Sequence, residues 1–169
     1  MPPESIAALY DAHAPALYRF LLSLTGSEAD TRDLLQDLFI KLVRQPAPVL
    51  TDPQAWLFRS ARNGFIDLVR RNAHRRGVMS RYEAEVASPS PHDFSPPAAP
   101  DPTLAIAHAL AGLPEEQRAV VHLKIWENLT FARIAEILDI PANTAASRYR
   151  YAMDRLRQTL PHPASHHAP

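Results

Sequence analysis

The sequence predicts an all-α protein made of two small helical domains joined by a proline-rich linker. Apolar residues recur every three or four positions through both halves of the 169-residue chain, which is the spacing of amphipathic helices. The alternating pattern typical of strands is essentially missing. A dense run of prolines divides the two helical parts.

The linker includes residues 88–102, SPSPHDFSPPAAPDP. Proline at this density prevents a helix and favours an extended spacer, and the run is too long for an ordinary turn. We therefore expect a first domain at 1–80, a linker at 81–103 and a second domain at 104–160. Residues 161–169, PHPASHHAP, are expected to form a disordered tail.

Three helices are expected in the first domain. The first ends at Gly26, and Ser27 with Asp30 resembles a capping box that begins the second. Asp52-Pro53 starts the third, because Asp is a good N-cap and Pro suits the first helical position. We expect this third helix to end near Arg70, with further arginines carrying the basic charge past its end.

The second domain has the pattern of a helix-turn-helix. Two helices, at about 104–110 and 114–126, precede a short helix capped by Thr130. A turn at 139–141 leads to a longer basic helix from about 142 to 160, and this order is typical of DNA-reading domains. One face of the long helix carries Thr144, Arg148, Tyr151 and Arg155. An ordinary solvated amphipathic helix remains the competing interpretation.

The net charge of zero conceals an alternation along the chain. Residues 46–81 and 142–157 are basic, and the segments beside them are acidic. Two separate basic patches suit contact with nucleic-acid phosphates, although solvated surfaces look similar. In the first patch Trp56, Phe58 and Phe65 interleave with arginines and could stack on unpaired bases, whereas Trp56 taken alone is more typical of a core position. The polar face Asp33, Gln36, Asp37 and Lys41 is undecided between solvent and a basic partner.

Several classes of function are disfavoured. The chain has no cysteine, its histidines are scattered, and it has no glycine loop that could cradle a phosphate. We therefore expect no catalytic residue, no metal site, no cofactor and no small-molecule substrate. No apolar run is long enough to span a bilayer and no signal peptide is visible, so we expect a cytoplasmic protein without direct membrane insertion.

With these motifs in place, the chain resembles the extracytoplasmic-function (ECF, group IV) sigma factors of the sigma-70 family. DLLQDLFIKLVR (33–44) is similar to region 2.2, and AWLFRSARNGFIDLVRR (55–71) looks like regions 2.3 and 2.4. Residues 113–157 resemble region 4 throughout. The resemblance implies a non-catalytic protein that carries bacterial RNA polymerase core to promoter DNA, and typically one held inactive by an anti-sigma factor.

The resemblance also implies a role for particular residues. Those expected to bind core polymerase are Asp33, Gln36, Asp37 and Phe39. Those expected at the −10 element are Arg59, Arg62, Asn63, Arg70 and Arg71, with the loop Gln45–Pro53 capturing a flipped base. Those expected at the −35 element are Asn143, Thr144, Ser147, Arg148, Arg150, Tyr151 and Arg155.

Some positions depart from the family pattern. Ala145 and Ala146 stand where relatives often carry a branched residue and a lysine, which shifts base contacts toward Arg150 or Tyr151. Arg133 stands where relatives often carry glutamate, which removes the capping-box partner of Thr130. Two other functions remain open: a free-standing helix-turn-helix regulator that binds duplex operator DNA without polymerase, and a non-catalytic adaptor that binds RNA.

Overall fold

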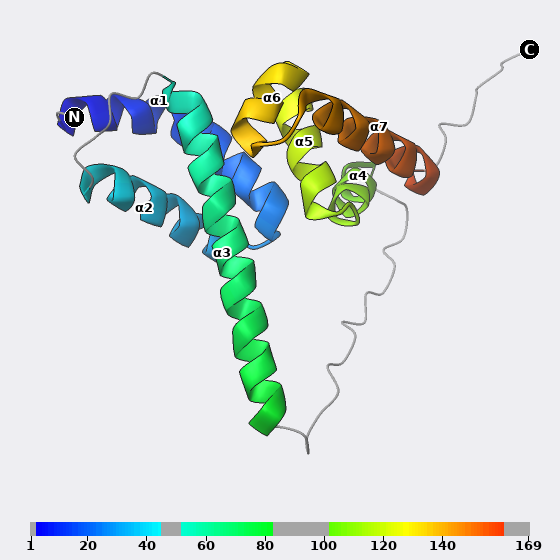
Figure 1. The fold of residues 1–169 in the computed structure, drawn as a ribbon, viewed down its shortest axis with the longest axis horizontal. Helices are drawn as coiled ribbons and strands as arrows, with labels where there is room; N and C mark the ends of the chain where they lie inside the picture. The colour runs from blue at the N-terminus through cyan, green and yellow to red at the C-terminus, as the bar shows by residue number, and fades with distance from the viewer. Residues whose placement is uncertain (1–2, 45–51, 83–101, 161–169) are drawn as a thin grey trace, which may run out of the picture.

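The computed structural model describes residues 3–44, 52–82 and 102–160, with side chains at 6–44, 52–75 and 105–160. The described residues form seven helices and no strand, which confirms the all-α prediction. The first domain contains α1 (Pro3–Thr25), α2 (Glu28–Arg44) and α3 (Pro53–Tyr82). The second contains α4 (Pro102–Ala111), α5 (Glu115–Ile125), α6 (Phe131–Leu138) and α7 (Ala142–Thr159), as Figure 1 shows. Most of the linker, residues 45–51 of the expected base-capturing loop, and the tail lie outside the described residues.

The predicted helix boundaries follow from local hydrogen bonds. Ser27 Oγ accepts from the backbone N–H of Asp30, and Asp52 Oδ1 accepts from that of Ala55, so both N-caps are confirmed. Thr130 likewise caps α6 by accepting from the N–H of Arg133. Each side chain satisfies an N–H that the first helical turn leaves without a partner.

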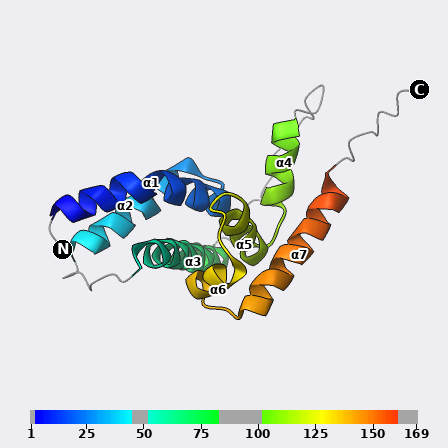
Figure 2. The same cartoon turned by 90° about the horizontal axis from the view of Figure 1, so that it is seen from above.

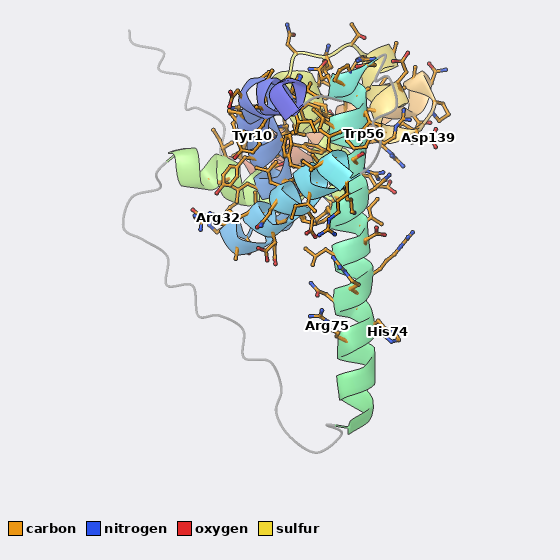
Figure 3. All side chains as sticks on the ribbon, turned by 90° about the vertical axis from the view of Figure 1, so that its left-hand side faces the viewer. Tyr10, Arg32, Trp56, His74, Arg75 and Asp139 are labelled. Atoms are coloured by element: carbon orange, nitrogen blue, oxygen red, sulfur yellow. The ribbon has the colours of Figure 1, made fainter. Side chains whose placement is uncertain are left out.

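One helix boundary was predicted wrongly. The third helix was expected to end near Arg70, but α3 continues to Tyr82. The segment after Arg70 contains four arginines, which are good helix formers, and no proline, so the helix continues through Gly77. Its end projects beyond the other helices, and His74 and Arg75 extend sideways from this projecting part (Figure 3).

The three helices of the first domain enclose an aromatic and aliphatic core. Leu17, Phe20 and Phe58 are fully buried, and the rings of Phe20 and Phe58 meet edge-on with centroids 5.3 Å apart. Gly64 of α3 faces Leu34 of α2, and a Cβ built at Gly64 would lie 3.4 Å from a methyl carbon of Leu34, which is an ordinary van der Waals contact. Phe65 is buried as well, so the idea that Phe58 and Phe65 stack on unpaired bases was wrong.

In the second domain, α7 packs across α5 and α6 through small residues. Ala145 and Ala152 are fully buried, while Tyr149 and Leu156 are partly buried. The turn between α6 and α7 depends on Asp139, whose φ of 54° lies in the left-handed region. Its neighbour Ile140 donates its N–H to the carbonyl of Ala135, which closes the end of α6.

The two domains pack against each other. Figure 2 shows α5 and α6 lying beside α1 and α3, and the buried residues of both domains form one cluster that includes Phe20, Phe58, Leu123 and Ile137. Nothing in the sequence analysis predicted this contact, because the linker suggested domains that are independent of each other.

Substitutions at Asp139 test the turn. Replacement by valine should lower the free energy of unfolding by about 1–2 kcal/mol, because a β-branched residue tolerates the left-handed region poorly. Asp139→Gly should leave stability equal or slightly higher, since glycine adopts this conformation without strain. Urea denaturation measures both variants. Because Asp139 is exposed, an equal loss in both would show that its side chain, and not the backbone conformation, matters.

Candidate nucleic-acid and protein interfaces

The outer surface of α2 divides the residues expected to bind polymerase between two grooves. Gln36 and Phe39 line a groove of about 610 Å³ between α1 and α2. Phe39 is 8% exposed and meets Tyr10 edge-on with ring centroids 4.8 Å apart, so it forms the floor of this groove. Asp37 lines the groove on the other side of α2, and Asp33 is exposed. Gln36 and Phe39 therefore face one groove and Asp37 the other, and the four residues do not form a single pocket.

The second groove, also about 610 Å³, lies between α2 and α3. It brings together three of the five residues expected at the −10 element, namely Asn63, Arg70 and Arg71. Trp56 is half-buried: it packs against the core and also lines this groove. A groove with exposed arginines and an accessible aromatic edge suits a single nucleic-acid strand.

The other two predicted −10 residues face the second domain. Arg59 donates from Nη2 to the carbonyl of Glu136, and from Nε to that of Ile137 at 3.4 Å. The guanidinium of Arg62 contacts both carboxylate oxygens of Glu115, at 3.0 and 3.4 Å, and its side chain is only 15% exposed. The structure therefore separates Arg59 and Arg62 from Asn63, Arg70 and Arg71.

Helix α7 exposes part of the predicted −35 set. Asn143, Arg150, Tyr151 and Arg155 are exposed, and Arg150 lies over the ring of Tyr151, 5.5 Å from its centroid. Thr144 and Ser147 are half-buried, and Ser147 donates its hydroxyl to the carbonyl of Asn143. Arg148 was expected on an open solvent face, but it is 22% exposed and pairs with Glu116 of α5 at 2.7 Å.

The sequence analysis missed the residues that join the domains. Arg118 of α5 donates to the carbonyls of Ser23 and Leu24 at the end of α1. Arg133 pairs with Asp52, the N-cap of α3. The departure of Arg133 from the family pattern was a signal, but it predicted only that Thr130 loses its capping-box partner and did not indicate Asp52 as the partner of Arg133.

Buried polar groups mark the contact between α1 and α5. The ring of His122, which is 4% exposed, stacks on Trp126 at 5.1 Å and meets Phe20 edge-on at 5.4 Å. Burial, helped by the positive charge of Arg19, lowers the pKa of His122 to about 4. The imidazole is therefore neutral at pH 7, and its Nε2, 3.8 Å from Glu127 Oε1, forms no ion pair there.

The described residues contain no cluster of three or more histidine, cysteine or acidic side chains that could hold a metal ion. None of their helices is long and apolar enough to cross a membrane.

Comparison with known proteins decides the family. A model described as sigma-70 region 2 matches residues 9–75, and one described as sigma-70 region 4 matches residues 109–158. The ECF RNA polymerase sigma factor SigL of Mycobacterium tuberculosis is 38% identical over 159 residues, which cover 90% of this chain and 87% of SigL. The chain belongs to the ECF sigma factors. It is therefore an alternative RNA polymerase sigma factor with a region 2 and a region 4 domain.

One further curated relative and two solved structures are also similar to this ECF sigma factor. RpoE of Cereibacter sphaeroides is 28% identical over 171 residues, covering 92% of this chain and 86% of RpoE. The sigma factor RpoE from Bartonella quintana, solved with the anti-sigma factor NepR, gives a TM-score of 0.66 at 23% identity and covers 92% of this chain and 94% of its own. CnrH, solved with the cytosolic domain of CnrY, gives a TM-score of 0.61 at 21% identity and covers 93% of this chain and 88% of its own. These two structures share the fold.

The depressed pKa of His122 predicts a loss of stability in mild acid. Between its unfolded pKa near 6.5 and its folded pKa near 4, the unfolded chain binds more protons, so the free energy of unfolding falls as the pH falls. At pH 5 His122 should lower it by about 2 kcal/mol relative to pH 7.5. Urea denaturation at both values measures the change. His122→Gln removes this titration and should flatten the profile; an unchanged profile would rule out His122 as the cause.

Proposed function

We propose that this alternative sigma factor divides promoter recognition among three helices. The outer surface of α2 binds RNA polymerase core through Asp33, Gln36, Asp37 and Phe39. The α2–α3 groove and its neighbours Arg59 and Arg62 bind the opened −10 strand. The N-terminal and exposed part of α7 reads the −35 duplex. Residues 1–80 and 104–160 would be the working units, with 81–103 as the linker.

The observation that carries this proposal is the α2–α3 groove. It holds Asn63, Arg70 and Arg71 beside Trp56, within the residues 9–75 that match sigma-70 region 2. Arginine supplies phosphate contact, while an amide and an indole can contact an unstacked base. On the other domain, Arg150, Tyr151 and Arg155 offer donors and an aromatic ring on one exposed helix that is narrow enough for a major groove.

The proposal extends to regulation and location. The structural relatives RpoE and CnrH were solved with the anti-sigma factor NepR and the cytosolic domain of CnrY. By analogy, an anti-sigma factor would hold this chain inactive until it is needed. We also infer that the protein acts in the cytoplasm, where polymerase is found, and that it performs no catalysis of its own.

A free-standing helix-turn-helix regulator is the alternative function. It would leave the region 2 match and the polar surface of α2 without a role. Tight, sequence-specific binding to duplex DNA in the absence of polymerase would favour it.

Charge reversal on α2 tests the polymerase contact. Wild-type protein should bind core polymerase and start transcription from specific promoters in run-off assays on genomic fragments. Asp33→Lys with Asp37→Lys should weaken core binding by about tenfold or more, because like charges then meet across the interface. Glu28→Lys with Asp30→Lys, an equal charge change on the same helix outside this set, is the control. Equal weakening by this control pair would indicate a general charge effect.

Alanine substitutions on α7 test the duplex-reading role. On promoters identified by run-off transcription, Arg150→Ala and Tyr151→Ala should each weaken promoter binding by about 1–3 kcal/mol and relax discrimination at a −35 position. Arg157→Ala serves as the control, since Arg157 lies on the same helix but pairs with Asp154 at 2.9 Å. If mutating the −35 sequence affects wild type and both variants equally, these residues do not read it.

A further inference from the structure

A pocket of about 440 Å³ lies where the C-terminal end of α1 meets α4 and α5. Helix α1 packs against both of the others, which lie near one of its ends in Figure 2. We call this space the α1–α4–α5 pocket. None of the residues that line it belongs to the sets proposed for polymerase, the −10 strand or the −35 duplex. The proposed function therefore leaves the pocket without a role.

The lining of the α1–α4–α5 pocket is mainly apolar. It comes from Leu22 of α1 and from Ala107, Leu110 and Ala111 of α4. Trp126, at the end of α5, lines the pocket as well and is 45% exposed. An indole that is left this open gains contact area when an apolar ring covers it. Small-molecule sites have this size and this apolar character, with only a few polar groups among the lining residues.

The charge of the lining is one-sided, because two arginines and no acidic side chain line the pocket. Arg118 is already engaged, since its terminal nitrogens donate to four backbone carbonyls. The side chain of Arg19 is 53% exposed, and its ion-pair partner Glu127 lies 3.7 Å away, which is beyond a hydrogen bond. The guanidinium of Arg19 can therefore form a paired contact with an incoming carboxylate.

Buried nitrogen atoms without partners lie at the base of the same pocket. His122 lines it, is 4% exposed, and has no hydrogen-bond partner for Nε2 among the described residues. The same is true of Nε of Arg118. Buried polar groups in a finished core are nearly always paired, so two unpaired ones beneath one apolar space indicate a binding site better than a packing surface. The neutral imidazole adds no second charge beside Arg19.

We propose that the α1–α4–α5 pocket binds a small apolar carboxylate. The carboxylate pairs with Arg19, and the apolar body lies against Leu22, Leu110 and the indole of Trp126. A fused aromatic acid matches the flat face of that indole. This site goes beyond promoter recognition and does not depend on it. Because the ligand contacts α1 of one domain and α4 and α5 of the other, its binding also stabilises the packing of the two domains.

The first test compares three probes that share one ring system and differ in charge. Naphthoate should bind the full chain in titration calorimetry. The neutral naphthamide should bind about tenfold more weakly, because it loses the charge-assisted contact with Arg19. Naphthylmethylamine, which is positively charged, should bind more weakly still. Equal affinity for naphthoate and naphthamide, or no binding of naphthoate at millimolar concentration, would overturn the proposal.

Removing the cation tests the assigned contact. Arg19→Gln should weaken naphthoate binding by about tenfold and change naphthamide binding by less than about twofold. Arg32→Gln is the matched control, since it removes the same charge from an arginine that lines the separate groove between α1 and α2. Circular dichroism and urea denaturation confirm that both variants are folded. If both weaken naphthoate binding equally, the effect is one of net charge and Arg19 is not the partner.

Filling the pocket tests its position. Ala107 is exposed, so Ala107→Phe places a ring in the pocket without rebuilding the core. It should weaken naphthoate and naphthamide alike by about tenfold or more, because both need the occupied space. Ala132→Phe, at an exposed position of α6 that does not line the pocket, is the control. Unchanged binding by Ala107→Phe would show that the probes bind elsewhere.

The two tryptophans of the chain locate the bound probe independently. Trp126 lines the α1–α4–α5 pocket, whereas Trp56 lines the α2–α3 groove. In nitrogen–proton correlation spectra, naphthoate should shift the indole N–H signal of Trp126 and leave that of Trp56 in place; the variant Trp126→Phe assigns the two signals. A shift of Trp56 alone would place the anion beside Arg70 and Arg71 and refute this site. Since neither polymerase nor DNA is present, failure here leaves the proposed function untouched.

Discussion

The packing of the two domains depends on arginine guanidinium groups that bind the carbonyl ends of helices across the interface. Arg118 donates to Ser23 and Leu24 at the end of α1 and to Ala111 and Leu113 at the end of α4, at 2.8 to 3.3 Å. One side chain thus satisfies carbonyls that two helices leave without partners. Burial lowers the pKa of Arg118, and these four contacts offset the loss of hydration. Arg59 repeats the arrangement in the opposite direction, at the end of α6.

This interface gives the charge alternation a structural meaning. Basic residues of the first domain meet acidic groups of the second in the pair Arg62–Glu115 and, more loosely at 3.7 Å, in Arg19–Glu127. Arg133 and Asp52 form the reverse pair. The sequence predicted that both basic segments contact nucleic-acid phosphates. The structure shows that Arg59 and Arg62 of the first segment already have partners within the chain.

Much of the local structure could be predicted because it depends on residues close together in the chain. The caps at Ser27, Asp52 and Thr130 need only a side chain and an N–H three residues later. The strained turn at Asp139 and the buried face of α7 were predictable for the same reason. The end of α3 was predicted wrongly, since no breaker marks the position where a helix leaves its domain.

The candidate sites were predictable only in part. Periodicity and family resemblance together identified the helices that carry them, but Phe58 and Phe65 proved to be core residues and Arg148 an ion-paired one. Some arginines of α3 face the α2–α3 groove and others face the second domain. This division could not be predicted, because it depends on contacts between residues that lie 53 to 78 positions apart in the chain.

The sequence by itself determined the helices, their caps, the division by prolines and the family, since each follows from local spacing or from motifs in order. Only the tertiary structure decided that Arg59 and Arg62 point at the second domain while Arg70 and Arg71 remain in the groove. The physical reason is that a guanidinium group takes whichever negative potential is nearest in space, and the chain brings the carbonyl end of α6 and the carboxylate of Glu115 to the first two only.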